Sequence, residues 1–198
     1  MDCCPWCGGD PTGADLIRPA LQEVEAALAG SRISPWGYRV LLRPGVSGVD
    51  PAYPKIVEIE KGYAAGRSRR RIDWPMLVGL IVHELGHSFL YHHVPWSRTE
   101  RFQRAFGDVE APYDVPDEVR VEFHHRRISR VPVDHVTPYA GLHPQEDFAE
   151  TFRFYVTRGA RLDDLFAELR EKRKAAAVRE RFVVLHDYLQ TLADRAVR

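Results

Sequence analysis

Two histidines and a glutamate lie within five consecutive residues, His83-Glu84-Leu85-Gly86-His87. Residues four apart on a helix share one face, so the imidazoles of His83 and His87 can reach the same zinc ion, each nitrogen about 2.0–2.1 Å from the metal. Glu84 would then stand beside a metal-activated water, and its carboxylate could take a proton as the water attacks a carbonyl. The pattern predicts two metal ligands and a general base.

The chain around this motif is apolar on nearly every side. Asp73 is a good helix N-cap, Pro75 suits the first turn, and residues 76–82 read Met-Leu-Val-Gly-Leu-Ile-Val. Burying two imidazoles and a carboxylate without partners would cost on the order of several kcal/mol. A metal site is therefore favoured over histidines that only pack in the core. Gly86 costs about 1 kcal/mol relative to alanine in a helix, but it leaves room for backbone or substrate near the metal.

A catalytic zinc needs a third protein ligand. His93 has metzincin spacing, but Leu90 stands where that family requires glycine. On a continuous helix His93 lies about 240° around the axis from His87 and cannot reach the same metal. A better candidate lies downstream, where Glu146 and Glu150 are four apart on one face of a predicted helix. Standing alone, this pair would be read as a solvated acidic face.

The two motifs together resemble a known group. His-Glu-Leu-Gly-His followed by Tyr-x6-Glu-Asp-Phe-Ala-Glu is similar to gluzincin-type peptidases of the anthrax lethal factor and Pro-Pro endopeptidase group, and to bacterial proteins called putative zinc-binding metallopeptidases. The resemblance covers about residues 73–93 and 139–155. It implies that Glu146 is the third zinc ligand, that Glu150 holds a zinc-bound histidine in place, and that Tyr139 stabilises the oxyanion or the leaving group.

All three cysteines, Cys3, Cys4 and Cys7, lie at the start of the chain. The bacterial relatives often begin with a zinc ribbon of two Cys-x-x-Cys knuckles, whereas this chain has one, formed by Cys4 and Cys7. It is open to reading as a degenerate ribbon, as a structural zinc site completed by a histidine or another chain, or as a redox pair. We expect residues 1–12 to form a cysteine-bearing leader and residues 13–198 to form a single zincin-like domain.

The expected fold class is α+β and zincin-like, with a small twisted sheet packed on the active-site helix and a mainly helical C-terminal part. Asp15 is the predicted cap of the first helix and Gly30 its stop. Residues 55–60 are a candidate edge strand for pairing with an extended substrate. Hydrophobic periodicity and turn residues predict the following elements: helices over 15–29, from 73 through the motif, 97–106, 144–157, 162–172 and 175–197, strands over 36–42 and 55–59, and an irregular stretch over 107–138.

Composition limits the partners. The chain has 28 basic and 28 acidic residues, so it has no global field that would draw it to nucleic acid or to an anionic membrane. It begins without the features of a signal peptide, and no segment approaches the roughly 18 apolar residues of a membrane span. We therefore expect a soluble, cytoplasmic protein that acts on a peptide or protein substrate and does not bind membranes.

The predicted function is zinc-dependent endopeptidase activity, and three alternatives remain open. The chain could be a metal-binding regulatory or DNA-associated protein that contacts its partner through residues 66–71 and 124–127. It could be a protease for a single partner protein. It could also hold a closed structural zinc whose fourth ligand is His135, His143 or a cysteine. If Glu146 is not the third ligand, the remaining candidates are His93, His143 and Asp147.

Overall fold

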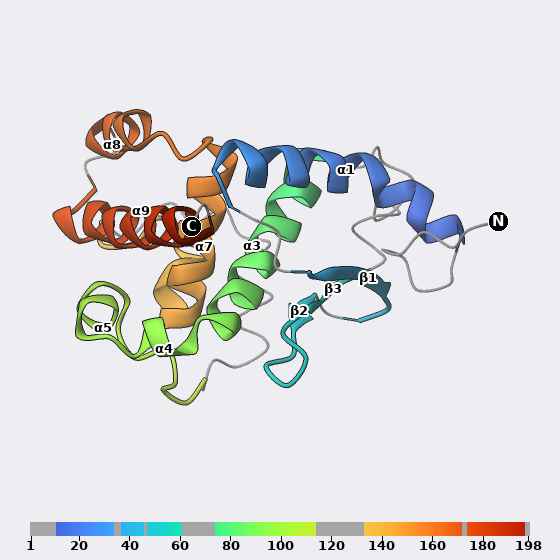
Figure 1. Cartoon of the computed structure of the whole chain (residues 1–198), viewed down its shortest axis with the longest axis horizontal. Coiled ribbons are helices and arrows are strands. Elements are labelled where there is room, and N and C mark those ends of the chain that lie inside the picture. Colours follow the sequence, from blue (N-terminus) through green and yellow to red (C-terminus); the bar gives the residue numbers. More distant parts are fainter. Residues whose placement is uncertain are drawn as a thin grey trace.

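The computed structural model describes residues 11–33, 37–45, 47–60, 74–113, 133–171 and 174–196. Over these ranges the chain forms seven α-helices, one short 3-10 helix and a three-stranded sheet (Figure 1). The expected α+β class, with a small sheet and a mainly helical C-terminal part, is confirmed. None of the described helices is both long enough and apolar enough to cross a membrane. The leader cysteines and the two basic segments lie outside the described residues.

Helix α1 (Pro11–Gly30) covers one side of the motif helix (Figure 1). It ends at the predicted glycine but begins earlier than predicted, so Asp15 lies inside the helix and is not its cap. Proline is well suited to the first position of a helix, because its missing N–H would have no partner there. From residue 17 onward, where its side chains are described, the helix buries four apolar residues at helical spacing, Ile17, Ala20, Val24 and Leu28.

The sheet has the strand order β1-β3-β2. Strand β1 (Arg39–Arg43) runs parallel to β3 (Ile56–Glu60), and the short strand β2 (Gly48–Val49) runs antiparallel to it. The prediction that residues 55–60 form an edge strand is therefore wrong, because β3 is the central strand. Sequence periodicity marks a segment as a strand but carries no information about its neighbours, which are chosen by long-range pairing.

Helix α3 (Trp74–His92) carries the motif through the middle of the molecule (Figure 1). It contacts α1, the sheet and the later helix α7 (Pro144–Thr157). Every residue from Ile81 to Leu90 is buried, which agrees with the apolar composition predicted for this helix. Its predicted cap, Asp73, lies outside the described residues.

The helix predicted over residues 97–106 begins three residues later, as α5 (Glu100–Phe106), and a separate short helix, α4 (Val94–Ser97), precedes it. The break lies at Thr99, whose backbone is extended and whose side-chain oxygen accepts a hydrogen bond from the N–H of Phe102. Threonine is a good N-cap, so the second helix begins after it and not at residue 97.

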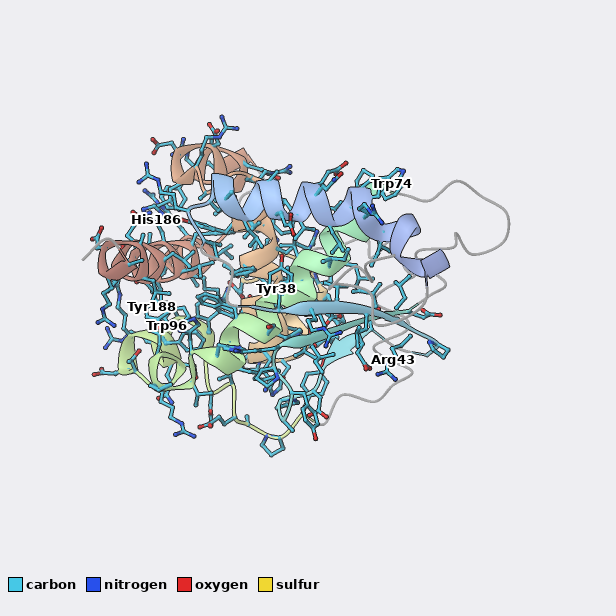
Figure 2. All side chains as sticks on the ribbon, turned by 45° about the vertical axis from the view of Figure 1, so that its right-hand side comes forward. Tyr38, Arg43, Trp74, Trp96, His186 and Tyr188 are labelled. Carbon is cyan, nitrogen blue, oxygen red and sulfur yellow. The ribbon has the colours of Figure 1, made fainter. Side chains whose placement is uncertain are left out.

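The C-terminal part begins with the 3-10 helix η1 (Tyr139–Leu142), followed by α7, α8 (Leu162–Glu171) and α9 (Ala176–Ala196). Helix α7 has the predicted bounds, α8 begins at the predicted residue, and α9 begins one residue after its predicted start. The predicted last residues of α8 and α9 lie outside the described part of the chain. Helix α9 packs on α5 and α7. Figure 2 shows Tyr188 of α9 beside Trp96 of α4, and these two rings stack at a centroid distance of 3.9 Å.

Gly86 of α3 lies in close contact with the backbone of α7. A Cβ atom added to it would lie 2.9 Å from the Cα atom of Ala149 and 3.3 Å from its carbonyl oxygen. Real Cβ atoms are not found this close to backbone, so only glycine allows the two helices to pack as they do. The room that Gly86 was predicted to leave is filled by the backbone of α7.

Candidate metal centre

Helices α3 and α7 bring three potential ligand atoms together. The Nε2 atom of His83 lies 3.1 Å from Oε2 of Glu146, and the Nε2 atom of His87 lies 3.3 Å from the same oxygen. The two Nε2 atoms are 3.2 Å apart. All three side chains are buried. The three atoms thus form a nearly equilateral triangle in the interior.

This triangle has the dimensions of one face of a zinc coordination shell. Ligands about 2.0–2.1 Å from a tetrahedral zinc are separated from one another by about 3.3–3.4 Å. Within the described chain, Oε2 of Glu146 is buried and has no hydrogen-bond partner. A buried carboxylate oxygen without a partner is costly, and a cation would satisfy it. Two imidazole nitrogens and one carboxylate oxygen also match the His₂Glu ligand set of catalytic zinc sites.

Glu150 fixes the orientation of His83. Its Oε1 atom lies 2.8 Å from Nδ1 of His83 and accepts the Nδ1 hydrogen, so the Nε2 atom is turned toward the triangle. Arg153 donates from Nε to Oε1 at 2.8 Å and from its terminal nitrogen to Oε2 at 2.7 Å. The Thr137 hydroxyl donates to Oε2 at 2.7 Å. Four hydrogen bonds therefore hold this carboxylate in one position.

His87 is held differently. Its ring is stacked near that of Tyr91 at a centroid distance of 6.4 Å and an interplanar angle of 23°. Its Nδ1 atom is buried and has no hydrogen-bond partner in the described part of the chain. The two histidines of the motif therefore have unequal support, since only His83 is oriented by a carboxylate.

The two carboxylates of α7 beside the histidine pair, Glu146 and Glu150, are stabilised in their charged form. Burial raises the pKa of Glu146, but the neighbouring His87 and His83 outweigh burial and hold this pKa well below its ordinary value. Burial also raises the pKa of Glu150, yet His83 and Arg153 lower it further than burial raises it. Burial lowers the pKa of His83, and the two carboxylates raise it to about 10. Both carboxylates are therefore ionised at neutral pH, and the site favours a positive charge.

The structure also brings the predicted catalytic residues to this region. Glu84 is buried on α3 beside the first ligand. Burial first, then the negative charges of Glu146 and Glu84, raise the pKa of Tyr91 to about 12, so these two carboxylates act on the same hydroxyl. Tyr139 in η1 lies against His83, with ring centroids 5.6 Å apart.

His93 faces away from the triangle. Its Nδ1 atom is hydrogen-bonded to the Tyr188 hydroxyl at 2.9 Å, and its ring packs on Phe89 at a centroid distance of 4.2 Å. Helix α3 continues to His92, so it does not turn as a metzincin helix does. This agrees with the argument from Leu90 that His93 cannot share the metal with His87.

The other alternative ligands are engaged elsewhere. His143 caps α7, accepting a hydrogen bond from the Gln145 N–H at Nδ1 and lying 3.2 Å from the Ala111 carbonyl through Nε2. The Oδ2 atom of Asp147 lies 2.9 Å from Nε of Arg181 and 3.0 Å from Nδ1 of His135. Among the described residues, the group that could hold a metal ion consists of His83, His87 and Glu146.

Three supporting residues were not predicted from the sequence: Arg153, Thr137 and Tyr113. Arg153 follows Glu150 by three residues, a spacing that pairs opposite charges on a helix and could have identified it. Thr137 and Tyr113 lie in the stretch predicted to be irregular, which gives no periodic signal. The Tyr113 hydroxyl donates to Oε1 of Glu146 at 2.6 Å, so both oxygens of this carboxylate have defined surroundings.

Comparison with known proteins places the chain in a family. The family model described as putative zinc-binding metallo-peptidase matches residues 57–186. This range contains the motif helix, Glu146 and Glu150 of α7, and Tyr139. No curated protein and no solved structure matches the chain significantly. The family match, together with the buried His-His-Glu group, confirms the predicted zinc cofactor. The chain belongs to the family of putative zinc-binding metallo-peptidases.

Proposed function

We propose that the chain is a zinc-dependent endopeptidase in which His83, His87 and Glu146 hold the ion and Glu84 is the general base. The observation that carries this proposal is the buried triangle of ligand atoms, in which Oε2 of Glu146 has no hydrogen-bond partner within the described chain. When bound, zinc would polarise the attacking water and the carbonyl of the scissile peptide bond.

The number of ligands supports a catalytic site over a structural one. Structural zinc sites are closed by four protein ligands, whereas catalytic sites use three and keep one position open. The described residues supply three ligands, and the nearby side chains of His143 and Asp147 are engaged in other hydrogen bonds and ion pairs.

The chain's own residues would carry the proton and position the substrate. The Glu84 carboxylate takes one proton from the attacking water as the new carbon–oxygen bond forms, and returns it to the nitrogen of the departing amine as the carbon–nitrogen bond breaks. The Tyr139 hydroxyl donates a hydrogen bond to the carbonyl oxygen as negative charge develops there, or to the leaving group. Glu150 keeps the His83 ring fixed throughout, since its hydrogen bond to Nδ1 does not involve the reacting atoms.

The test combines metal analysis with a peptide-library cleavage assay. Glu84→Gln should retain one zinc per chain and lose cleavage by about 100-fold to 10,000-fold, the usual contribution of a general base. Glu146→Ala should lose zinc. Glu100→Gln is the matched control, because Glu100 is an exposed residue of α5 that is paired with Arg104. Full proteolysis by Glu84→Gln would refute the mechanism.

A hydroxamate inhibitor separates this proposal from a closed structural site. A hydroxamate binds only where a coordination position is open, so it should compete with cleavage and should shift the thermal unfolding of the zinc-loaded protein. A zinc-loaded protein that neither binds a hydroxamate nor cleaves any peptide would point to a structural zinc instead.

A further inference from the structure

The two oxygen atoms of the Glu146 carboxylate have different neighbours. Its Oε2 atom faces the Nε2 atoms of His83 and His87, while its Oε1 atom accepts a hydrogen bond of 2.6 Å from the Tyr113 hydroxyl. Tyr113 is half-buried, and its ring lies 4.6 Å from the ring of His143. A tyrosine far from both sequence motifs thus touches the predicted third ligand directly.

Residues 107–113, here called the Tyr113 segment, are hydrogen-bonded to the first turn of α7 and to the residue that caps it. The side-chain amide of Gln145 donates to the Val109 carbonyl at 2.7 Å, and Nε2 of His143 lies 3.2 Å from the Ala111 carbonyl. With the hydrogen bond between Tyr113 and Glu146, three side chains at the start of α7 each bind one residue of the segment. The pairs are His143 with Ala111, Gln145 with Val109 and Glu146 with Tyr113. The position of the Tyr113 hydroxyl is therefore fixed by the same helix turn that carries Glu146.

The backbone conformation at the beginning of the segment requires a glycine, Gly107. Gly107 has a φ of +91°, a conformation that favours glycine, and a Cβ atom added to it would lie 3.3 Å from Cγ of Pro144. The chain therefore leaves α5 in close contact with the first residue of α7. An alanine at this position would strain the backbone and push the segment away from the helix.

We propose that Tyr113 is a positioning residue that restricts Glu146 to one metal-binding oxygen and so keeps the fourth coordination position available for water. This inference rests on the proposed function. Carboxylates bind metals through one oxygen or through both, and hydrogen bonds to a ligand decide its orientation. With Oε1 held by a phenol hydroxyl, Oε2 alone is directed at the metal. Without this hydrogen bond, the carboxylate is free to turn and present both oxygens.

The test is cobalt(II) substitution of the full chain with Tyr113→Phe. Four-coordinate cobalt(II) absorbs visible light more strongly than five-coordinate cobalt(II), so the spectrum reports on the ligand shell independently of activity. We expect the variant to bind one cobalt with weaker absorption, and to hold zinc about 10-fold to 100-fold less tightly in competition with a chelator. A purely structural role for the tyrosine would leave the absorption per bound cobalt unchanged.

Tyr188→Phe is the matched control. It also removes one tyrosine hydroxyl that forms a hydrogen bond, but that hydroxyl contacts His93 and not a member of the triangle. It should leave the cobalt spectrum and the zinc affinity as in the unmodified chain. Gly107→Ala gives a second route, because it displaces the segment without removing the hydroxyl, and it should weaken the absorption in the same direction.

The outcomes separate the two proposals. If the unmodified chain binds neither zinc nor cobalt, the proposed function and this inference both fail. If the unmodified chain gives a strong four-coordinate spectrum and both Tyr113→Phe and Gly107→Ala give the same spectrum and the same zinc affinity, the inference about Tyr113 fails while the proposed function stands.

Discussion

The Cα atom of Ala149 lies 2.9 Å from the position that a Cβ atom would occupy on Gly86. This approach sets the spacing between α3 and α7, and so the distance between the histidines of one helix and the carboxylates of the other. Glu146 and Glu150 lie on either side of Ala149, three residues before it and one after it. The glycine of the motif therefore determines whether the ligand triangle can form.

Gly86→Ala should separate the two helices and dismantle the triangle. Overpacking of a well-packed interior costs about 1–3 kcal/mol, and the loss of ligand geometry should also lower zinc stoichiometry. Chemical unfolding of the metal-free protein and metal analysis of the loaded protein measure the two effects. Gly79→Ala is the control, because a Cβ there would meet only Arg153 at 3.6 Å and 3.7 Å, which is ordinary contact. Unchanged stability and zinc content in Gly86→Ala would contradict this interpretation.

Glu150→Gln should weaken zinc binding without abolishing it. The substitution removes the negative charge that accepts the Nδ1 hydrogen of His83 and two hydrogen bonds from Arg153. Loss of such a partner of a metal-binding histidine typically costs about 10-fold to 100-fold in affinity. Competition with a chromophoric chelator measures the change. Glu168→Gln also removes a carboxylate paired with an arginine, but on α8 and away from the site, so its zinc affinity should not move.

Protonation of His93 in the unfolded chain should lower the free energy of unfolding as the pH falls below neutral. Burial first, then the neighbouring His92, lower its pKa to about 4 in the folded state. An unfolded histidine has a pKa near about 6.5, so between these values the unfolded chain binds a proton that the folded chain excludes. The free energy of unfolding should therefore be insensitive to this group above pH 6.5, fall as the pH drops toward 4, and level off below.

Urea unfolding of the metal-free protein between pH 4 and pH 7 measures this effect. His93→Gln should reduce the slope over this range, because glutamine does not titrate. Tyr188→Phe keeps the histidine and tests whether the partner hydroxyl contributes. A pH profile of His93→Gln parallel to that of the unmodified chain would rule out His93 as the source of the acid sensitivity.

Arg181→Ala should be among the more destabilising single substitutions. Arg181 is buried on α9, donates to the Ala105 carbonyl at 3.0 Å and to the Asp134 carbonyl, and pairs with Asp147 at 2.9 Å. Its removal leaves the Asp147 carboxylate buried without this cation, a change that typically costs about 3–5 kcal/mol. Arg101→Ala is the comparison, because its pair with Asp187 is exposed and contributes less than about 1 kcal/mol. Equal losses of unfolding free energy in the two variants would contradict the prediction.

Local signals accounted for the elements that are correctly predicted. The helix over Pro144–Thr157 has the predicted bounds because a proline favours its first turn and the preceding residue caps it. The break at Thr99 was missed because a threonine can stand inside a helix or cap one, and only the folded chain shows its extended backbone. The central position of β3 was missed because strand order depends on pairing between distant segments.

Some residues of the candidate site could be predicted from local spacing, and others depend on contacts between distant segments. His83 and His87 share a helix face, so their meeting follows from spacing alone. Glu146 lies about sixty residues later. The need for a third ligand drew attention to the Glu146 and Glu150 pair, and the resemblance to a family motif assigned the ligand role to Glu146. Tyr113 belongs to no periodic element and no motif, so its contact with Glu146 could be found only from the packing of the folded chain.

Glu146 and Asp147 are neighbours on α7 whose side chains serve different partners, one facing the histidine pair and the other held by Arg181 of the C-terminal helix. One helix turn thus takes part in two equilibria, zinc uptake and the docking of α9. Thermodynamic linkage is reciprocal, so whatever free energy the docked helix adds to zinc binding, zinc returns to the docking. A coupling of this kind would appear as a change in zinc affinity when the Arg181–Asp147 pair is removed, and as a change in the protection of α9 from proteolysis when zinc binds.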